Sequence, residues 1–188
     1  VKQIYLMGSI SMQSPRVSDE DSTAADPAIL IHEFVGHMAW LNDSHGMEWW
    51  GNMSGINGDF LIWDKWSMGF LNDNQIVCLP RNSQSTIWLR PNTLKDSGTK
   101  GIMIPLDPYK VIVIESQRST GYNFKFPKSS NGVLVYLVDS NVNDERENIT
   151  ILRLDGAKNA KTTFAQYPSL TSEQCLIQEE IKICVDQS

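Results

Sequence analysis

The stretch PAILIHEFVGHMAWL, residues 27–41, decides the fold of the first half of this chain. It starts like a helix, because Asp26 is a good N-terminal cap and Pro27 stands at the first helical position, where its missing N–H group costs nothing. Apolar side chains then recur at roughly helical spacing as far as Leu41. The sequence therefore predicts one helix over this stretch, which ends in the polar segment 42–46.

The three histidines of the chain all lie in this helix or in the turn that follows it, and acidic residues are interleaved with them. A zinc peptidase requires two neutral imidazoles on one face of a helix, a carboxylate that takes a proton from the metal-bound water, and a third ligand from the following turn. The cluster therefore predicts a zinc site in which His32 and His37 are metal ligands and Glu33 is the catalytic base.

The spacing of the two helical histidines is one residue longer than in the usual pattern H-E-x-x-H. On a regular α-helix, positions five apart diverge by about 140°, so His32 and His37 would face different sides. A single-turn π-bulge absorbs one extra residue through an i to i+5 hydrogen bond, and Gly36 stands where such a distortion is cheapest. We therefore expect a π-bulge that makes the two imidazoles neighbours.

The third ligand is predicted to be Asp43. It lies six residues after His37, which is the offset used in the extended pattern H-E-x-x-H-x-x-G-x-x-(His or Asp). In that pattern a glycine turns the chain back towards the metal, whereas this chain has Trp40, which tolerates a positive φ poorly. His45 and Glu48 remain as competing candidates for the third ligand.

A second helix is predicted over residues 60–71, with Asp59 as its cap. Its aromatic residues recur at spacings of three or four and predict a buried stripe. The members of the stripe are Phe60, Trp63, Trp66 and Phe70.

Short β-rich runs separated by Pro, Gly, Asn and Asp follow Asn72, and one further strand is predicted at residues 4–10. This pattern of short strands and turn residues is typical of an antiparallel sandwich or barrel. The later runs are residues 75–79, 86–90, 101–106, 110–115, 133–139, 149–154, 174–177 and 181–185.

Two of the three cysteines flank a segment that is typical of a hairpin. If Glu179 and Glu180 form a two-residue turn, Cys175 and Cys184 lie directly opposite each other, where a cross-strand disulfide can form. Two buried free thiols are the alternative, and Cys78 is solitary.

The composition is that of an ordinary folded protein, with 41% hydrophobic and 20% charged residues among 188. The net charge of -6 is spread along the chain, and no run of Lys or Arg predicts a nucleic-acid partner. No stretch approaches the roughly 18 apolar residues of a transmembrane segment. Because the first residue is Val1 rather than Met, we expect the start to be a cut.

Several segments resemble, in order and spacing, the immune inhibitor A family of secreted bacterial zinc metallopeptidases. They are HEFVGH at 32–37, LND at 41–43, WGNMSG at 50–55, IWDKWSMGFL at 62–71 and GVLVYLVD at 132–139. The resemblance implies zinc held by His32, His37 and Asp43, with Glu33 as general base and Met53 beneath the metal. It also implies secretion, and a protein or peptide as the substrate.

The fold that this resemblance implies is α+β. Residues 1–79 would form the C-terminal part of a zincin-like catalytic domain with two helices, truncated at its N-terminus. Residues 80–188 would form a β-rich, antiparallel, sandwich-like region.

The chain departs from the family at the extra residue in the histidine motif, at Trp40 in place of Gly, and at Gly51 in place of Asp. These departures favour a second hypothesis, a catalytically inactive relative that acts as a secreted binding or surface protein. A third hypothesis is a β-sandwich adhesion module in which the helical part serves only for packing.

Overall fold

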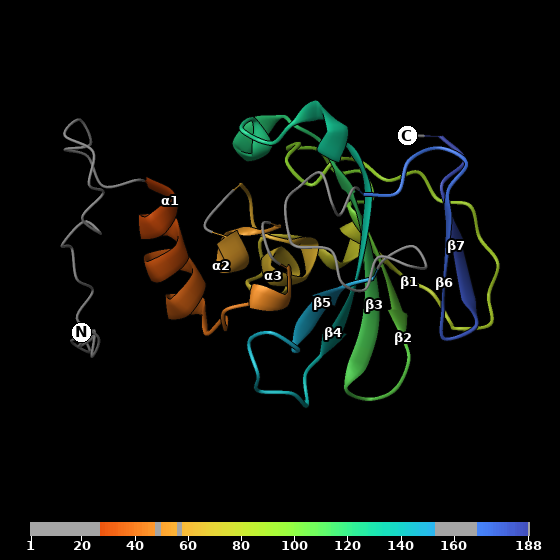
Figure 1. Cartoon of the computed structure of the whole chain (residues 1–188), viewed down its shortest axis with the longest axis horizontal. Helices are drawn as coiled ribbons and strands as arrows, with labels where there is room; N and C mark the ends of the chain where they lie inside the picture. Colours follow the sequence, from red (N-terminus) through yellow and green to blue (C-terminus); the bar gives the residue numbers. More distant parts are fainter. Residues whose placement is uncertain (1–26, 48–49, 56–57, 153–168, 188) are drawn as a thin grey trace.

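A computed structural model describes residues 27–47, 50–55, 58–152 and 169–187 of the chain. A central sheet separates short helices on one side from a β-hairpin on the other (Figure 1). The predicted strand at residues 4–10 and the predicted cap Asp26 lie outside the described residues. Within the described ranges, no helix has the length and apolar character needed to cross a bilayer.

The central sheet has five strands in the order β1-β2-β3-β4-β5. They are β1 (Ile76–Cys78), β2 (Gly101–Pro105), β3 (Lys110–Gln117), β4 (Gly132–Asp139) and β5 (Ile149–Ile151). Strands β1 and β2 pair in parallel, whereas the other pairs are antiparallel. The prediction of a mixed α and β fold with a mostly antiparallel sheet is therefore confirmed.

The two faces of the sheet are buried by different partners, as the period of two along each strand requires. On β3, Val113 packs towards the helices, while Ile112 and Ile114 pack towards the hairpin. The helix-side core combines Met47, Trp50 and Leu61 with Met103, Val113, Leu134, Tyr136 and Val138. Residues before and after position 79 thus pack in one cluster.

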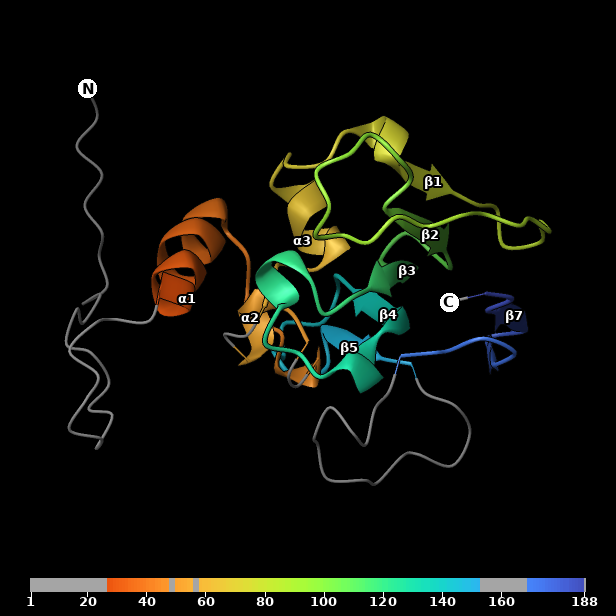
Figure 2. The same cartoon turned by 90° about the horizontal axis from the view of Figure 1, so that it is seen from above.

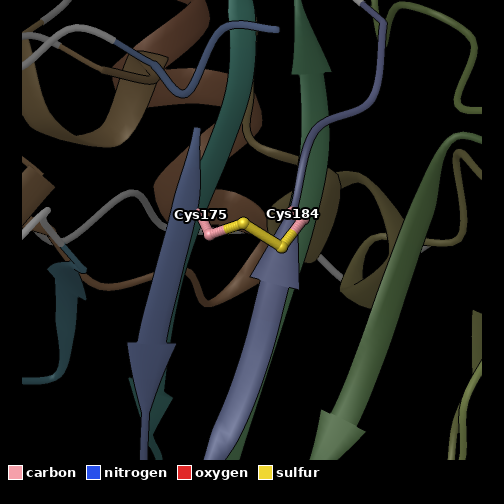
Figure 3. The surroundings of a disulfide bond; sticks show 2 residues. All are labelled: Cys175 and Cys184. Carbon is pink, nitrogen blue, oxygen red and sulfur yellow. A yellow bond between two sulfur atoms is a disulfide. The ribbon is translucent and has the colours of Figure 1, made fainter. Parts of the chain in front are cut away.

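The hairpin consists of β6 (Cys175–Gln178) and β7 (Ile181–Cys184). The turn residues Glu179 and Glu180 have φ angles of 51° and 66°, as a tight two-residue hairpin turn requires. Cys175 pairs with Cys184 across the strands, and the two form a disulfide (Figure 3). The predicted hairpin turn is confirmed, and of the two alternatives for the cysteines the structure has the disulfide rather than two buried free thiols.

The histidine helix is made of α1 (Pro27–Leu30), a π-helix η1 (Ile31–Gly36) and a 3₁₀ turn η2 (His37–Ala39). Two further α-helices, α2 (Asn52–Gly55) and α3 (Ile62–Ser67), lie between it and the sheet (Figures 1 and 2). Single 3₁₀ turns complete the described elements: η3 (His45–Met47), η4 (Asp73–Gln75), η5 (Gly121–Asn123) and η6 (Lys128–Ser130).

The predicted aromatic stripe is wrong in its second half. Phe60 is buried and Trp63 packs against the core, but Trp66 is 37% and Phe70 61% exposed. The reason is that α3 ends at Ser67 and Gly69 takes a positive φ of 75°, so Phe70 is no longer in phase with the helix.

The strand predicted at residues 86–90 is also absent from the described structure. Ile87 and Leu89 are half-buried and pack against the hairpin-side core, so the apolar pattern that predicted a strand reflects burial without strand pairing. The described residues therefore form one sheet with a separate hairpin on its face, and the two comparable sheets of a sandwich are not found among them.

Helix α3 is tied to the sheet through the buried carboxylate of Glu115 on β3. One oxygen of this carboxylate accepts the backbone N–H of Ile62 at 2.7 Å and the hydroxyl of Tyr136 at 2.9 Å. Burial raises the pKa of Glu115 to about 7. Burial, together with the charge of Glu115, raises the pKa of Asp64 on α3 to about 7 as well. The helix–sheet contact thus contains two buried acids.

These acids should make folding depend on pH. Between about pH 4 and 7 folded Asp64 binds a proton that the unfolded chain has released, so its contribution to stability falls as the pH rises through this window. The variant Asp64→Asn removes this loss. The difference in free energy of unfolding between Asp64→Asn and the wild type should therefore be larger at pH 8 than at pH 4.5. We expect this difference to grow by about 2–4 kcal/mol in favour of the variant.

Urea unfolding at the two pH values measures this difference. The exposed Asp186, replaced by Asn, is the matched control and should leave the difference unchanged. A difference between Asp64→Asn and the wild type that is the same at both pH values would contradict the expectation.

Candidate metal centre

The extra residue of the histidine motif is absorbed by the π-helix η1. The backbone N–H of His37 donates to the carbonyl of His32, which is the i to i+5 bond of a π-turn. The two imidazole rings lie with their centroids 4.9 Å apart and their planes at 88°. The predicted π-bulge is therefore confirmed, and it makes the two rings neighbours.

Backbone carbonyls fix how both rings are protonated. His32 Nδ1 lies 2.9 Å from the carbonyl oxygen of Asn52 on α2, and His37 Nδ1 lies 3.1 Å from that of Leu41. A carbonyl oxygen can only accept, so each Nδ1 carries the proton. In a neutral ring, Nε2 then presents a lone pair, which is the form in which histidine binds a metal.

Both Nε2 atoms face the carboxylate of Asp43. Its Oδ1 atom lies 3.2 Å from His32 Nε2 and 3.7 Å from His37 Nε2. Asp43 Oδ1 is nevertheless a buried oxygen without a hydrogen-bond partner among the described residues. Asp43 Oδ1 thus lies close to both Nε2 atoms. Ligands of a tetrahedral zinc ion lie roughly 3.4 Å apart, so the two distances from Asp43 and the chemistry of the three side chains fit zinc.

Glu33 belongs to the same cluster. A carboxylate oxygen of Glu33 and one nitrogen from each of His32 and His37 lie within 4.8 Å of one another. Glu33 is half-buried, so its side chain is open to solvent on one side. Glu33 thus lies close enough to both rings to contribute a ligand atom to the same group.

The turn that carries Asp43 forms in spite of Trp40. Trp40 takes a left-handed conformation, with φ 63° and ψ 24°, and the N–H of Leu41 donates to the carbonyl of Gly36. The N–H of Trp40 donates to the carbonyl of His37. These two bonds are those of a Schellman helix end, in which glycine usually takes the left-handed position. The ring of Trp40 is 92% exposed.

Gly36 has a different role from the one expected. Its backbone has ordinary helical angles, φ −64° and ψ −64°, so its conformational freedom is not what forms the π-turn. A Cβ atom at this position would lie 2.2 Å from Met53 Sδ. A larger residue here would have to displace the thioether of the fully buried Met53, which packs directly beneath η1.

Gly51, a departure from the family pattern, also has a local cause. It takes a positive φ of 85°, and a Cβ atom there would lie 2.8 Å from Leu61 Cγ. Only glycine fits this turn, which leads into α2 and so positions the carbonyl that Asn52 offers to His32.

The structure places one of the two competing candidates for the third ligand, His45, and does not describe the other, Glu48. His45 Nε2 is 3.4 Å from a carboxylate oxygen of Glu145, and both side chains are about half exposed. Asp43, His45 and Glu145 form a second group of possible ligand atoms. Glu48 lies outside the described residues. Among the candidates that the structure describes, Asp43 is the one that contacts both helical histidines.

Comparisons of the chain with protein-family models, with curated proteins and with solved structures gave no match. The resemblance to the immune inhibitor A family therefore stays a prediction that rests on the order and spacing of the motifs.

The left-handed Trp40 generates a prediction about stability. A residue with a Cβ atom in this conformation costs roughly 1 kcal/mol relative to glycine. Because the ring buries almost nothing, Trp40→Gly should raise the free energy of unfolding by about 1 kcal/mol and leave the contacts of Asp43 with the two histidines in place.

Urea unfolding measures this gain. Trp40→Ala, which removes the same exposed ring but keeps a Cβ atom, is the control and should give no gain. Equal stability of the two variants would mean that the left-handed conformation is not the cause.

Proposed function

We propose that this protein is a zinc-dependent endopeptidase of the zincin type, similar to the immune inhibitor A family. The single observation that carries the proposal is the convergence of His32 Nε2, His37 Nε2 and the buried Asp43 Oδ1, whose contacts leave that oxygen without a hydrogen bond. Buried charges in folded proteins are paired or coordinate metal ions, so a buried carboxylate oxygen beside two imidazole nitrogens is a suitable place for a cation.

Each residue of the site would have a separate role in catalysis. His32, His37 and Asp43 would hold the ion, and the carbonyls of Asn52 and Leu41 would keep the two rings oriented. A bound zinc ion acts as a Lewis acid and lowers the pKa of a water ligand to about 7. Glu33 would accept the proton of the attacking water and return it to the leaving amine of the cleaved peptide.

The substrate would be a protein or a peptide, and the place of action outside the cell. The disulfide between Cys175 and Cys184 supports an oxidising compartment, because such bonds rarely persist in the cytosol. Both expectations come with the resemblance to secreted bacterial peptidases.

A second candidate is an inactive relative that serves as a binding protein. It is favoured by the ion-pair distance of 3.2 Å between His32 and Asp43, since a positively charged imidazole would satisfy the carboxylate without a metal. The two candidates differ in whether the site takes up zinc at neutral pH, where imidazole is mostly uncharged.

Metal content after dialysis against zinc tests the proposal directly. We expect about one zinc ion per chain in the wild type and almost none in His37→Ala. Asp43→Ala should weaken the affinity by at least tenfold, whereas His45→Ala should leave it within a factor of two. Glu33→Gln should keep the zinc and lose peptide hydrolysis by at least 100-fold.

Circular dichroism of each variant controls for loss of folding. A folded wild type that takes up no zinc at neutral pH would end the peptidase proposal in favour of the inactive relative. Zinc that disappears with His45→Ala and persists with Asp43→Ala would reassign the third ligand.

A further inference from the structure

The loop that carries Asp43 is held from a distant part of the chain. Residues 41–44 have no regular secondary structure, so the position of the carboxylate depends on tertiary contacts. Strand β5 and the loop that precedes it, residues 140–148, lie against the turn η3 that follows Asp43. Figure 1 shows the chain running from the histidine helix to the β5 side of the sheet.

Asn148 makes the central contact. Its side chain is buried, with 9% exposure, and its Nδ2 donates to the carbonyl oxygen of Asp43 at 3.0 Å. Its Oδ1 accepts the N–H of Ile149 at 2.7 Å. The backbone carbonyl of Asn148 accepts the N–H of Asp139, so β4 fixes the residue as well. The amide is therefore held at both ends and orients the backbone of Asp43.

Gly46 lets the two loops approach. Its N–H donates to the carbonyl of Glu145 at 3.2 Å. A Cβ atom on Gly46 would lie 2.3 Å from the carbonyl oxygen of Ile149 and 2.4 Å from that of Arg146. Backbone atoms cannot give way as a flexible side chain can, so any larger residue would push the loop of Asp43 away from β5.

We infer that Asn148 is a positioning residue of the metal centre, and that the loop before β5 fixes the third ligand through it. This inference rests on the proposed function, because it takes Asp43 as a zinc ligand. Asn148 does not contact the other donors. It acts on the site through the backbone of Asp43, which sets where the carboxylate oxygen meets His32 and His37.

The test uses cobalt(II) as a spectroscopic probe and zinc by competition with a chelator, on the whole chain. The variant Asn148→Asp keeps an acceptor for Ile149 N–H but turns an oxygen towards the Asp43 carbonyl. Loss of an outer partner of a metal ligand typically costs 10- to 100-fold in affinity. We expect a loss of this size, together with weaker cobalt absorption bands as the coordination changes.

Asn141→Ala, an exposed position in the same loop, is the matched control and should keep the wild-type affinity and spectrum. Asn148→Ala, which adds no charge, and Gly46→Ala, which moves the loop by contact, should both weaken binding. A general loss of stability would lower the melting temperature but would leave the cobalt spectrum of the folded fraction unchanged.

Hydrogen exchange of the wild type covers the case in which these variants do not fold. If the loop before β5 fixes Asp43, coupling between the two must be reciprocal, so bound zinc must also stabilise the loop. We therefore expect zinc to slow the hydrogen exchange of the Glu147 and Ile149 amides at least threefold. A wild type that binds no metal overturns the proposed function. A wild type that binds metal, with unchanged affinity in Asn148→Asp or with no protection of these amides, overturns only the inference about Asn148.

Discussion

The candidate site depends on one constraint, the five-residue step between its two helical histidines. A regular α-helix would separate the two rings, and the single i to i+5 bond between His37 and His32 removes that separation. The π-turn also sets where the helix ends, because the Schellman bond of Leu41 returns to Gly36, the last residue of η1. The direction in which the chain leaves towards Asp43 follows from that bond.

The donors sit on the outer layer of the fold, and their support comes from elements that are packed more deeply. Short helix α2 supplies the carbonyl that orients His32 and the Met53 side chain that fills the space under Gly36. Helix α2 also contacts the turn η3, which lies against β5 of the sheet. Each layer is therefore placed by the one beneath it, and irregular segments of little intrinsic stability can hold a defined geometry.

The sequence predicted the elements that have a local cause. Helical periodicity, the spacing of the histidines and the Glu179–Glu180 turn each carry their own physical signal, and the π-turn and the hairpin were predicted from them. The same turn placed the two cysteines opposite each other, but the choice between a disulfide and two free thiols stayed open. The missed features are set by distant parts of the chain. Asn148 supports Asp43 across 105 residues, and its local sequence does not indicate this contact. The exposure of Phe70 follows from where α3 ends, which periodicity alone does not fix.

The three positions at which the chain differs from the immune inhibitor A pattern all affect the same group of side chains. The left-handed Trp40 is a strained residue, and such strain costs about 1–3 kcal/mol. The π-turn and the glycine-only turn at Gly51 are restrictive rather than strained. They occur within 21 residues, and all three contribute to aiming His32, His37 and Asp43 at one point. A regular α-helix would turn His37 and the residues after it towards another side, so this placement of the side chains requires the π-turn. The joint effect of the three features on the donor atoms supports the proposed binding site.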